Sequence, residues 1–249
     1  MVRAPLATLV LLVLMDRSSQ VPVPSTTAPD TVQAGDPALD ASRLRPFVLT
    51  RQMTLRKGDT LTPFGQQSEQ LSRSTWDGQP VWLHVLSFET PRGGTVDSSW
   101  INAATLEPLR LRSSNRERVV TLEFGRRRVA SSIAPAAGNV TSLDQEFSVQ
   151  PFEWNMFGLA IATLPLHPGY RARMPVYSDR FSAVSWYTVE VVRDTNLIRS
   201  SGFRAPMWEV LATSDGNGPT ARLWVSERHR FVDRAQLSEP GIAILFSRD

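Results

Sequence analysis

Three histidines are the side chains of this chain best suited to bind a metal ion or to move a proton. They are His84, His167 and His229. None of them has a second histidine at the helical spacing that joins two metal ligands, and no H-E-x-x-H motif occurs. We therefore expect no metal site and no cofactor. His84 should be a satisfied residue of a buried strand, and the other two should be exposed in turns.

Nucleophilic catalysis lacks its usual motifs, because the chain has no cysteine, no G-x-S-x-G elbow and no S-x-x-K motif. Three carboxylates, Asp144, Glu146 and Glu153, lie close together in the sequence. Two of them could act as acid and base if folding brought them within reach. Loop solvation and a negative charge near a helix N-terminus also explain them. We expect a protein without catalytic residues, with a hydrolase as the alternative.

The densest basic run is "GRRR" at residues 125–128, between two predicted strands, which predicts a hairpin tip. Aromatic residues do not alternate with these arginines, as a surface that stacks nucleic-acid bases would require. The formal net charge of the whole chain is only +3. We therefore expect no nucleic-acid partner.

Aromatic residues are the remaining candidates for a binding site. The chain has seven tryptophans, most of which should belong to the core. Because apolar ligand pockets favour aromatic walls, some aromatic side chains are candidates for a cavity lining. The candidate ligand-binding residues are Trp82, Phe88, Trp154, Phe157, Trp186 and Trp208.

Alternation with a period of two dominates the chain from residue 46 onward, and it predicts an antiparallel β-sheet. Within residues 108–114, for example, Leu109 and Leu111 face one side while Arg110 and Arg112 face the other. Turn sequences such as "DGQP", "PRGG" and "DGNGP" separate the runs. The predicted strands are 46–56, 65–75, 80–90, 95–102, 108–114, 117–124, 127–133, 170–178, 183–194, 204–213, 220–227, 230–237 and 241–247.

Two predicted strands, around residues 80–88 and 183–192, are apolar on both faces, so something other than water should cover each face. The best cover is residues 151–166, "PFEWNMFGLAIATLPL". Pro151 suits the first helical position, and Pro165 would end the helix. A helix that is apolar all round must be buried. We predict a mainly β fold with one short buried helix, wrapped by a strongly curved antiparallel sheet that forms a half-open barrel.

The N-terminal residues predict export. An apolar run follows Arg3 and is too short for the roughly 20 residues of a membrane-spanning helix, so residues 1–20 read as a signal peptide. Residues 21–45 are rich in proline, serine and threonine and predict a disordered linker. Residues 46–249 should form a single β-rich domain. We expect a periplasmic or otherwise exported protein with no transmembrane span in the mature chain.

Four segments together resemble a known family. They are "DSSWINAATLEPLRLRS", "PLHPGY", "APMWEV" and "ARLWVSERHRFVDRAQL". Over residues 47–246 their order resembles the bacterial group known as domain of unknown function 3108. Members look like exported β-proteins related in fold to the outer-membrane lipoprotein carriers, in which a half-open barrel wraps a short helix. The resemblance implies a concave apolar interior and a role with hydrophobic cargo in the cell envelope, and it implies no catalytic residues.

Three functions agree with these observations. The first is a carrier or binding protein for an apolar small molecule or lipid. The second is an envelope scaffold or protein-interaction module with a filled core, whose partner would be an envelope protein. The third is an enzyme acting on envelope polymers or lipids, which would depend on the carboxylates near residue 150.

Overall fold

The computed structural model describes residues 29–180, 182–198, 204–216 and 218–248. Within them, one 16-stranded sheet and a few short helical turns make up the fold. The helical elements are η1 (Ala41–Arg43), η2 (Trp154–Met156) and α1 (Phe157–Thr163). The strands are β1 (Asp30–Thr31), β2 (Phe47–Lys57), β3 (Thr60–Trp76), β4 (Gln79–Thr90), β5 (Gly93–Asn102), β6 (Pro108–Asn115), β7 (Arg118–Gly125), β8 (Arg128–Pro135), β9 (Thr141–Glu146), β10 (Phe152–Glu153), β11 (Arg171–Ser178), β12 (Ala183–Ile198), β13 (Arg204–Ser214), β14 (Thr220–Ser226), β15 (Val232–Glu239) and β16 (Ile242–Ser247).

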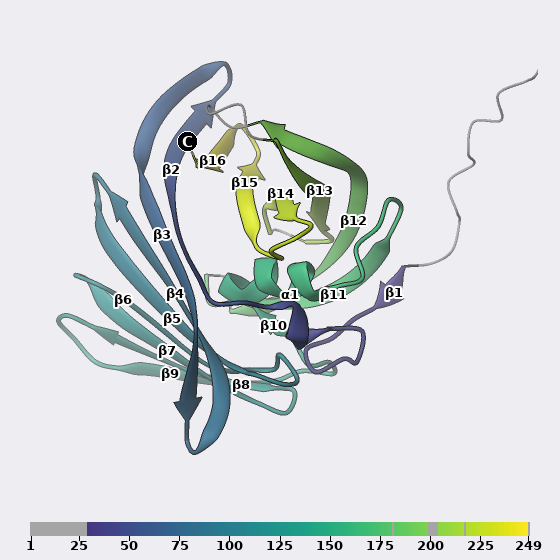
Figure 1. Ribbon diagram of the computed structural model, residues 1–249. Helices are drawn as coiled ribbons and strands as arrows, with labels where there is room; N and C mark the ends of the chain where they lie inside the picture. The colour runs from purple at the N-terminus through teal and green to yellow at the C-terminus, as the bar shows by residue number, and fades with distance from the viewer. Residues whose placement is uncertain (1–28, 181, 199–203, 217, 249) are drawn as a thin grey trace, which may run out of the picture.

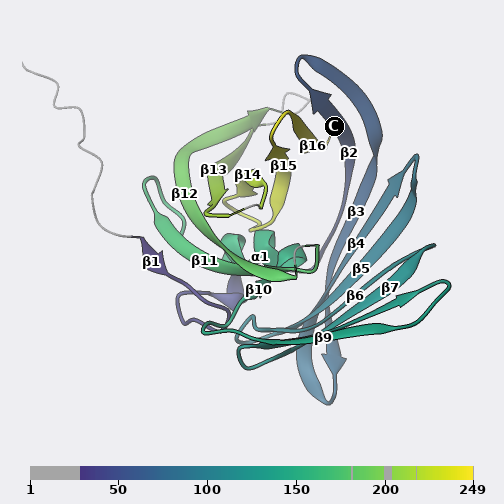
Figure 2. The same ribbon diagram turned by 180° about the vertical axis from the view of Figure 1, so that it is seen from behind.

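The sheet consists of two antiparallel meanders, β2 to β9 and β11 to β16, which join where β16 pairs with β2. It curls around α1, as both faces of the molecule show (Figure 1, Figure 2). Its two ends approach through side chains rather than a backbone ladder. The hydroxyl of Tyr177 on β11 donates to Gln145 on β9 at 3.3 Å, and Gln145 donates to the carbonyl of Ser182 at 3.0 Å. The predicted half-open barrel with a short buried helix is therefore confirmed.

Every predicted strand is present, with boundaries shifted by a few residues at most positions. The largest extension is β3, which begins at Thr60 rather than residue 65. The prediction missed β1, β9 and β10. Two of these have only two residues each, and β9 lies at an edge of the sheet with mostly exposed side chains, so it lacks an alternating apolar face.

The helix is buried as predicted but shorter than residues 151–166. Phe152 and Glu153 are extended because they pair with β11, and η2 precedes α1. The residue before Pro165 is also extended, as the proline ring requires, so the helix ends at Thr163. Ile161 and Ala162 on α1 are each 0% exposed. In the described part of the chain, no helix is long and apolar enough to cross a membrane.

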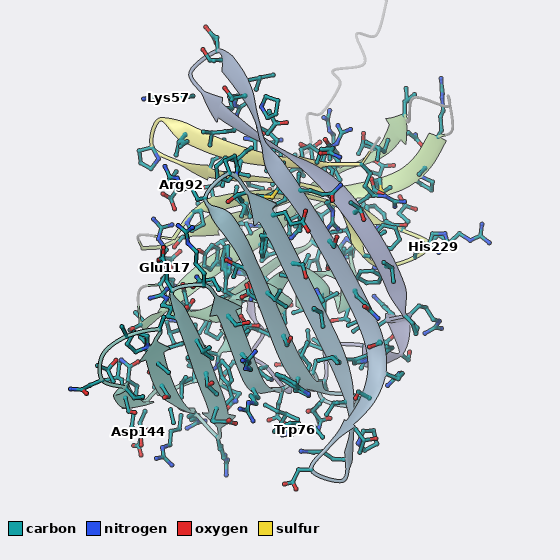
Figure 3. The ribbon with its side chains drawn as sticks, turned by 90° about the vertical axis from the view of Figure 1, so that its left-hand side faces the viewer. Lys57, Trp76, Arg92, Glu117, Asp144 and His229 are labelled. Carbon is teal, nitrogen blue, oxygen red and sulfur yellow. The ribbon has the colours of Figure 1, made fainter. Side chains whose placement is uncertain are left out.

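The expectation that both faces are covered is correct for the inner face of β4, but on the outer face it holds only at Val81, which is 0% exposed. On β4 the inward-facing Trp82, His84 and Leu86 are buried. Leu83 and Val85 face outward and are only half-buried. No second layer made of described residues lies over this outer face, which Figure 3 presents to the viewer. Neighbouring side chains of the same sheet provide the partial cover.

The expectation of a disordered linker is wrong for residues 29–45. In this stretch β1 pairs in parallel with β11. Val32, Leu39 and Leu44 are buried in the main core, with 2%, 7% and 1% of their surface exposed. These apolar residues cover one end of the interior and offset the ordering cost of a proline-rich segment. The predicted signal peptide and residues 21–28 lie outside the described residues.

Replacing Leu44 with alanine tests this correction. Because Leu44 is 1% exposed, Leu44→Ala should lower the free energy of unfolding by about 2–5 kcal/mol. Leu61→Ala removes the same atoms from a side chain that is 60% exposed, and it should change stability by less than about 0.5 kcal/mol. Urea unfolding followed by circular dichroism measures both. Equal effects of the two substitutions would show that residues 29–45 are not part of the folded core.

Candidate functional site

The first candidate site is a cavity of about 160 Å³ between α1 and the inner face of the sheet, which we call the inner cavity. Phe157, Gly158 and Leu159 provide its helix side. Gly158 allows a close approach to β15, since a Cβ atom there would lie 3.1 Å from a methyl group of Val232. Most of the wall is apolar, and one side of it is formed by polar side chains of β2, β3 and β4.

That polar side is a buried network which crosses three adjacent strands. Arg51 Nη1 on β2 lies 2.5 Å from Glu69 Oε2 on β3, and Glu69 Oε1 lies 2.9 Å from His84 Nε2 on β4. Arg51 also donates to Gln67 Oε1 at 3.0 Å and to the carbonyl of Asp233 at 3.2 Å. Arg51 and His84 are 2% and 1% exposed. Antiparallel pairing of these consecutive strands brings together residues that are 15 to 18 positions apart in the sequence.

The carboxylate of Glu69 is the centre of this network. Burial alone would raise its pKa, but the hydrogen bond with His84 and the positive charge of Arg51 outweigh burial and hold the pKa at about 2. Glu69 is therefore ionised at neutral pH, and its charge balances that of Arg51. Sequence reasoning missed this pair. The sequence did contain a signal for this pair. Arg51 stands between Leu49 and Met53 at an inward-facing position of its strand, and Glu69 also occupies an inward-facing position.

A second buried network connects η2 to β5. Ser99 Oγ donates to Glu153 Oε2 at 2.8 Å, and the backbone N–H of Asn155 donates to Glu153 Oε1 at 2.7 Å. Asn155 Nδ2 in turn donates to Asp97 Oδ2 at 3.1 Å. Burial raises the pKa of Glu153 to about 8, and it also raises the pKa of Asp97. The Glu153 carboxyl group is therefore mainly protonated at neutral pH.

The three carboxylates considered for acid–base chemistry do not form one site. Asp144 and Glu146 are exposed on the edge strand β9, and Asp144 forms an ion pair with Arg128 on β8. Figure 3 places Asp144 at the periphery of the sheet. Glu153 lies in the interior instead, bonded to Ser99. Strand pairing separates these residues even though they are neighbours in sequence.

A larger cavity of about 520 Å³, which we call the outer cavity, lies beside the inner one. Its walls are mainly apolar, and Arg180 and Glu239 form a 2.6 Å ion pair at its side. Trp154 and Leu237 line both cavities, so the two spaces meet at these side chains. The apolar residues of the outer cavity are Leu55, Phe64, Trp154, Val176, Tyr187, Pro219, Leu237, Ile242, Ala243 and Ile244.

Three of the six aromatic residues selected from the sequence line these cavities. Phe88, Trp154 and Phe157 line the inner cavity, and Trp154 also lines the outer one. The rings of Trp154 and Phe157 stack with centroids 6.0 Å apart. Both also contact Tyr187 of β12, at 5.7 and 5.1 Å. Aromatic side chains from the helical segment and the sheet thus form a continuous wall.

The other three do not line these cavities, which corrects the expected lining. Trp82 is 1% exposed in the core, and the guanidinium group of Arg73 lies 3.6 Å from the centre of its ring. Trp186 alternates with the inward-facing residues of β12, so it faces outward, where Arg173 lies over its ring. Trp208 packs against the main core. Whether a tryptophan lines a cavity therefore depends on which face of its strand it occupies and on where along the strand it lies.

The remaining sequence predictions concern the histidines and the basic run. His84 is buried and hydrogen-bonded as expected, although only through Nε2. His167 and His229 are exposed. Residues 125–128 connect β7 to β8 as a hairpin tip, as predicted. The described residues contain no group of three or more potential metal-binding side chains.

Removing the negative charge of Glu69 should destabilise the fold. Glu69→Gln leaves the buried guanidinium group of Arg51 without its counter-charge, which we expect to cost about 3–5 kcal/mol of unfolding free energy. The control is Glu89→Gln, an exposed carboxylate on the neighbouring strand, which should change stability by less than about 0.5 kcal/mol. Chemical denaturation at neutral pH compares them. A neutral effect of Glu69→Gln would contradict a stabilising ion pair.

Glu153 should make stability fall as pH rises. Its folded-state pKa of about 8 lies above its ordinary value of 4.5, so the folded state retains a proton that the unfolded state loses between these values. Over that range Glu153→Gln should gain stability relative to the wild type, by up to about 1.4 kcal/mol per pH unit. Denaturant unfolding at several pH values measures the difference. A difference that stays constant with pH would contradict the raised pKa.

Comparisons with known proteins agree with this architecture. A comparison with curated proteins finds no match. The crystal structure of a β-barrel-like protein of the domain of unknown function DUF1849 from Brucella abortus is similar, with a TM-score of 0.54 and 10% identity, and the match covers 82% of this chain and 96% of that one. At this identity the likeness concerns the fold alone. The family described as "Protein of unknown function (DUF3108)" matches residues 52–240. The chain therefore belongs to the DUF3108 family.

Proposed function

We propose that this protein is a non-catalytic binding or carrier protein for an apolar ligand, such as a lipid acyl chain, in the cell envelope. The observation that carries the proposal is the outer cavity of about 520 Å³ beside the inner cavity. This volume lies within the roughly 300–1,000 Å³ typical of small-molecule sites. The aromatic wall of Trp154, Phe157 and Tyr187 suits an apolar molecule.

The energetics of an acyl chain fit such a site. Each methylene group moved from water to an apolar wall contributes about 0.8 kcal/mol, so affinity can come from chain length without a charged anchor. The charged side chains along the outer cavity, Arg92, Asp179, Arg180 and Glu239, include both signs. They would solvate a polar end of the ligand without selecting strongly for one charge.

The proposal places the protein outside the cytoplasm. It rests on the apolar N-terminal run, which has the length and flanking charge of a signal peptide. A periplasmic location would give the protein access to lipids and lipoprotein-like molecules of the envelope.

A protein-interaction module is the second candidate, and the edge strand β9 favours it. An unpaired strand edge can accept a strand from a partner. Leu143 on β9 is 44% exposed and Val140 beside it is 60% exposed. An envelope protein that pairs with β9 would cover both side chains.

Filling the outer cavity tests the first proposal. Ala243 is 5% exposed and lines that cavity, so Ala243→Phe should reduce co-purifying lipid by at least about tenfold, because the ring occupies the space of the chain. Lipid extracted from protein purified from the native host is measured by mass spectrometry.

Ala134→Phe is the matched control, because Ala134 alternates with the inward-facing Ile133 on β8 and so faces away from the cavities. It should retain the lipid content of the wild type, and circular dichroism should show that both variants fold. A wild-type protein that carries no lipid and binds no acyl chain in vitro would refute the proposal. A specific protein captured through β9 would then favour the second candidate.

A further inference from the structure

We infer that the inner cavity selects a ligand whose buried end carries a hydroxyl group, and that His84 is the residue that recognises this hydroxyl. The inference rests on the proposed function and adds the chemical class of the ligand. It is carried by a buried ring nitrogen that has no hydrogen-bond partner among the described residues, on a residue that lines a mainly apolar cavity.

His84 has one ring nitrogen in use and one unused. Nε2 lies 2.9 Å from Glu69 Oε1, whereas Nδ1 is buried and has no hydrogen-bond partner among the described residues. His84 lines the inner cavity and is 1% exposed. A buried polar atom without a partner destabilises the fold. A ligand group that bonds to Nδ1 would remove this penalty, and the gain would appear as binding energy.

Gln67 adds a second polar group to the same wall. Its Oε1 accepts a hydrogen bond from Arg51 at 3.0 Å, so the orientation of the amide is set. No hydrogen bond among the described residues uses its Nε2, and Gln67 lines the inner cavity. Two residues of the cavity lining, Gln67 and His84, therefore carry an amide nitrogen and a ring nitrogen that no described residue uses.

The charge balance of the network favours a neutral ligand group. The positive charge of Arg51 is balanced by Glu69 at 2.5 Å, and Arg51 donates further to the backbone carbonyls of Val232 and Asp233. A carboxylate or ammonium group placed here would be an additional buried charge without a counter-ion, which is costly.

A hydroxyl group fits both states of the His84 ring. When the ring is neutral and Nε2 donates to Glu69, Nδ1 is an acceptor, and a hydroxyl can donate to it. When the ring is protonated, Nδ1 is a donor, and the hydroxyl oxygen can accept. A carboxylate would suit only the second state, and an alkane would suit neither.

The size of the inner cavity indicates which part of a ligand it holds. A cavity of about 150 Å³ in another protein accommodates a benzene molecule, so about 160 Å³ is enough for a short aliphatic segment. Trp154 and Leu237 also line the outer cavity, where the rest of a longer chain would lie. The ligand class is thus an amphiphile with its hydroxyl end directed toward His84.

The test compares n-hexanol, n-hexane and hexanoate as probes of the full chain. Dissociation constants come from chemical-shift titrations of the tryptophan indole signals at neutral pH. We expect n-hexanol to bind at least about tenfold more tightly than n-hexane and hexanoate, because only the alcohol provides a neutral partner for Nδ1.

A variant assigns the preference to His84. His84→Phe keeps an aromatic ring but removes Nδ1, so it should weaken n-hexanol binding by about tenfold and leave n-hexane binding within about twofold. His167→Phe, at an exposed histidine, is the control and should change neither. Should His84→Phe fail to fold, as judged by circular dichroism, Gln67→Leu takes its place. The three probes applied to the wild type still test whether the cavity prefers a hydroxyl group.

The outcomes separate this inference from the proposed function. If n-hexane binds as tightly as n-hexanol, or if hexanoate binds most tightly, the hydroxyl preference is refuted while the apolar site stands. If none of the probes binds, both are refuted. Loss of the preference in His84→Phe alone would support the assignment of the hydroxyl to His84.

Discussion

A single curved sheet has to bury its concave apolar face, and the rest of this structure depends on how it does so. The segment from β10 to Leu164, just after α1, performs this role. Phe152, Ile161 and Leu164 are each 0% exposed, and the strands of both meanders pack around them. The outer face has no such layer and remains half-buried. Removing the helical segment from the interior would expose the inward-facing residues of both meanders to water.

The same geometry explains why cavities remain. The strands are long, up to the 17 residues of β3, which extend over roughly 56 Å at about 3.3 Å per residue. The helix has seven residues and spans only about 10 Å at 1.5 Å per residue. A helix this short cannot fill the interior of a sheet this large. The N-terminal residues 29–45 cover one end, and the inner and outer cavities occupy part of what is left.

The buried ionisable groups Arg51, Glu69 and Glu153 are compatible with burial because each has hydrogen-bond partners. Arg51 and Glu69 compensate each other, and Glu153 is neutral at the pH where the pair is charged. The first network crosses three consecutive strands, β2, β3 and β4, whereas the second joins η2 to β5, which is distant from it in sequence. His84 Nδ1, Trp82 Nε1 and Trp208 Nε1 are among the buried atoms without a hydrogen-bond partner in the described part of the chain, and of these three residues His84 lines the inner cavity.

The sequence by itself determined most of the strands, their turns and the burial of the helix, because a period of two residues and an all-apolar run between prolines can be recognised within short windows. It also indicated correctly that Trp154 and Phe157 belong to the interior. Only the tertiary structure decided which polar residues meet. Arg51, Glu69 and His84 belong to three strands, and their contacts exist because strand pairing aligns them across the inner face. The prediction of a disordered linker at residues 29–45 was wrong for a related reason. The few apolar side chains of this segment are buried only because the folded core provides residues for them to contact.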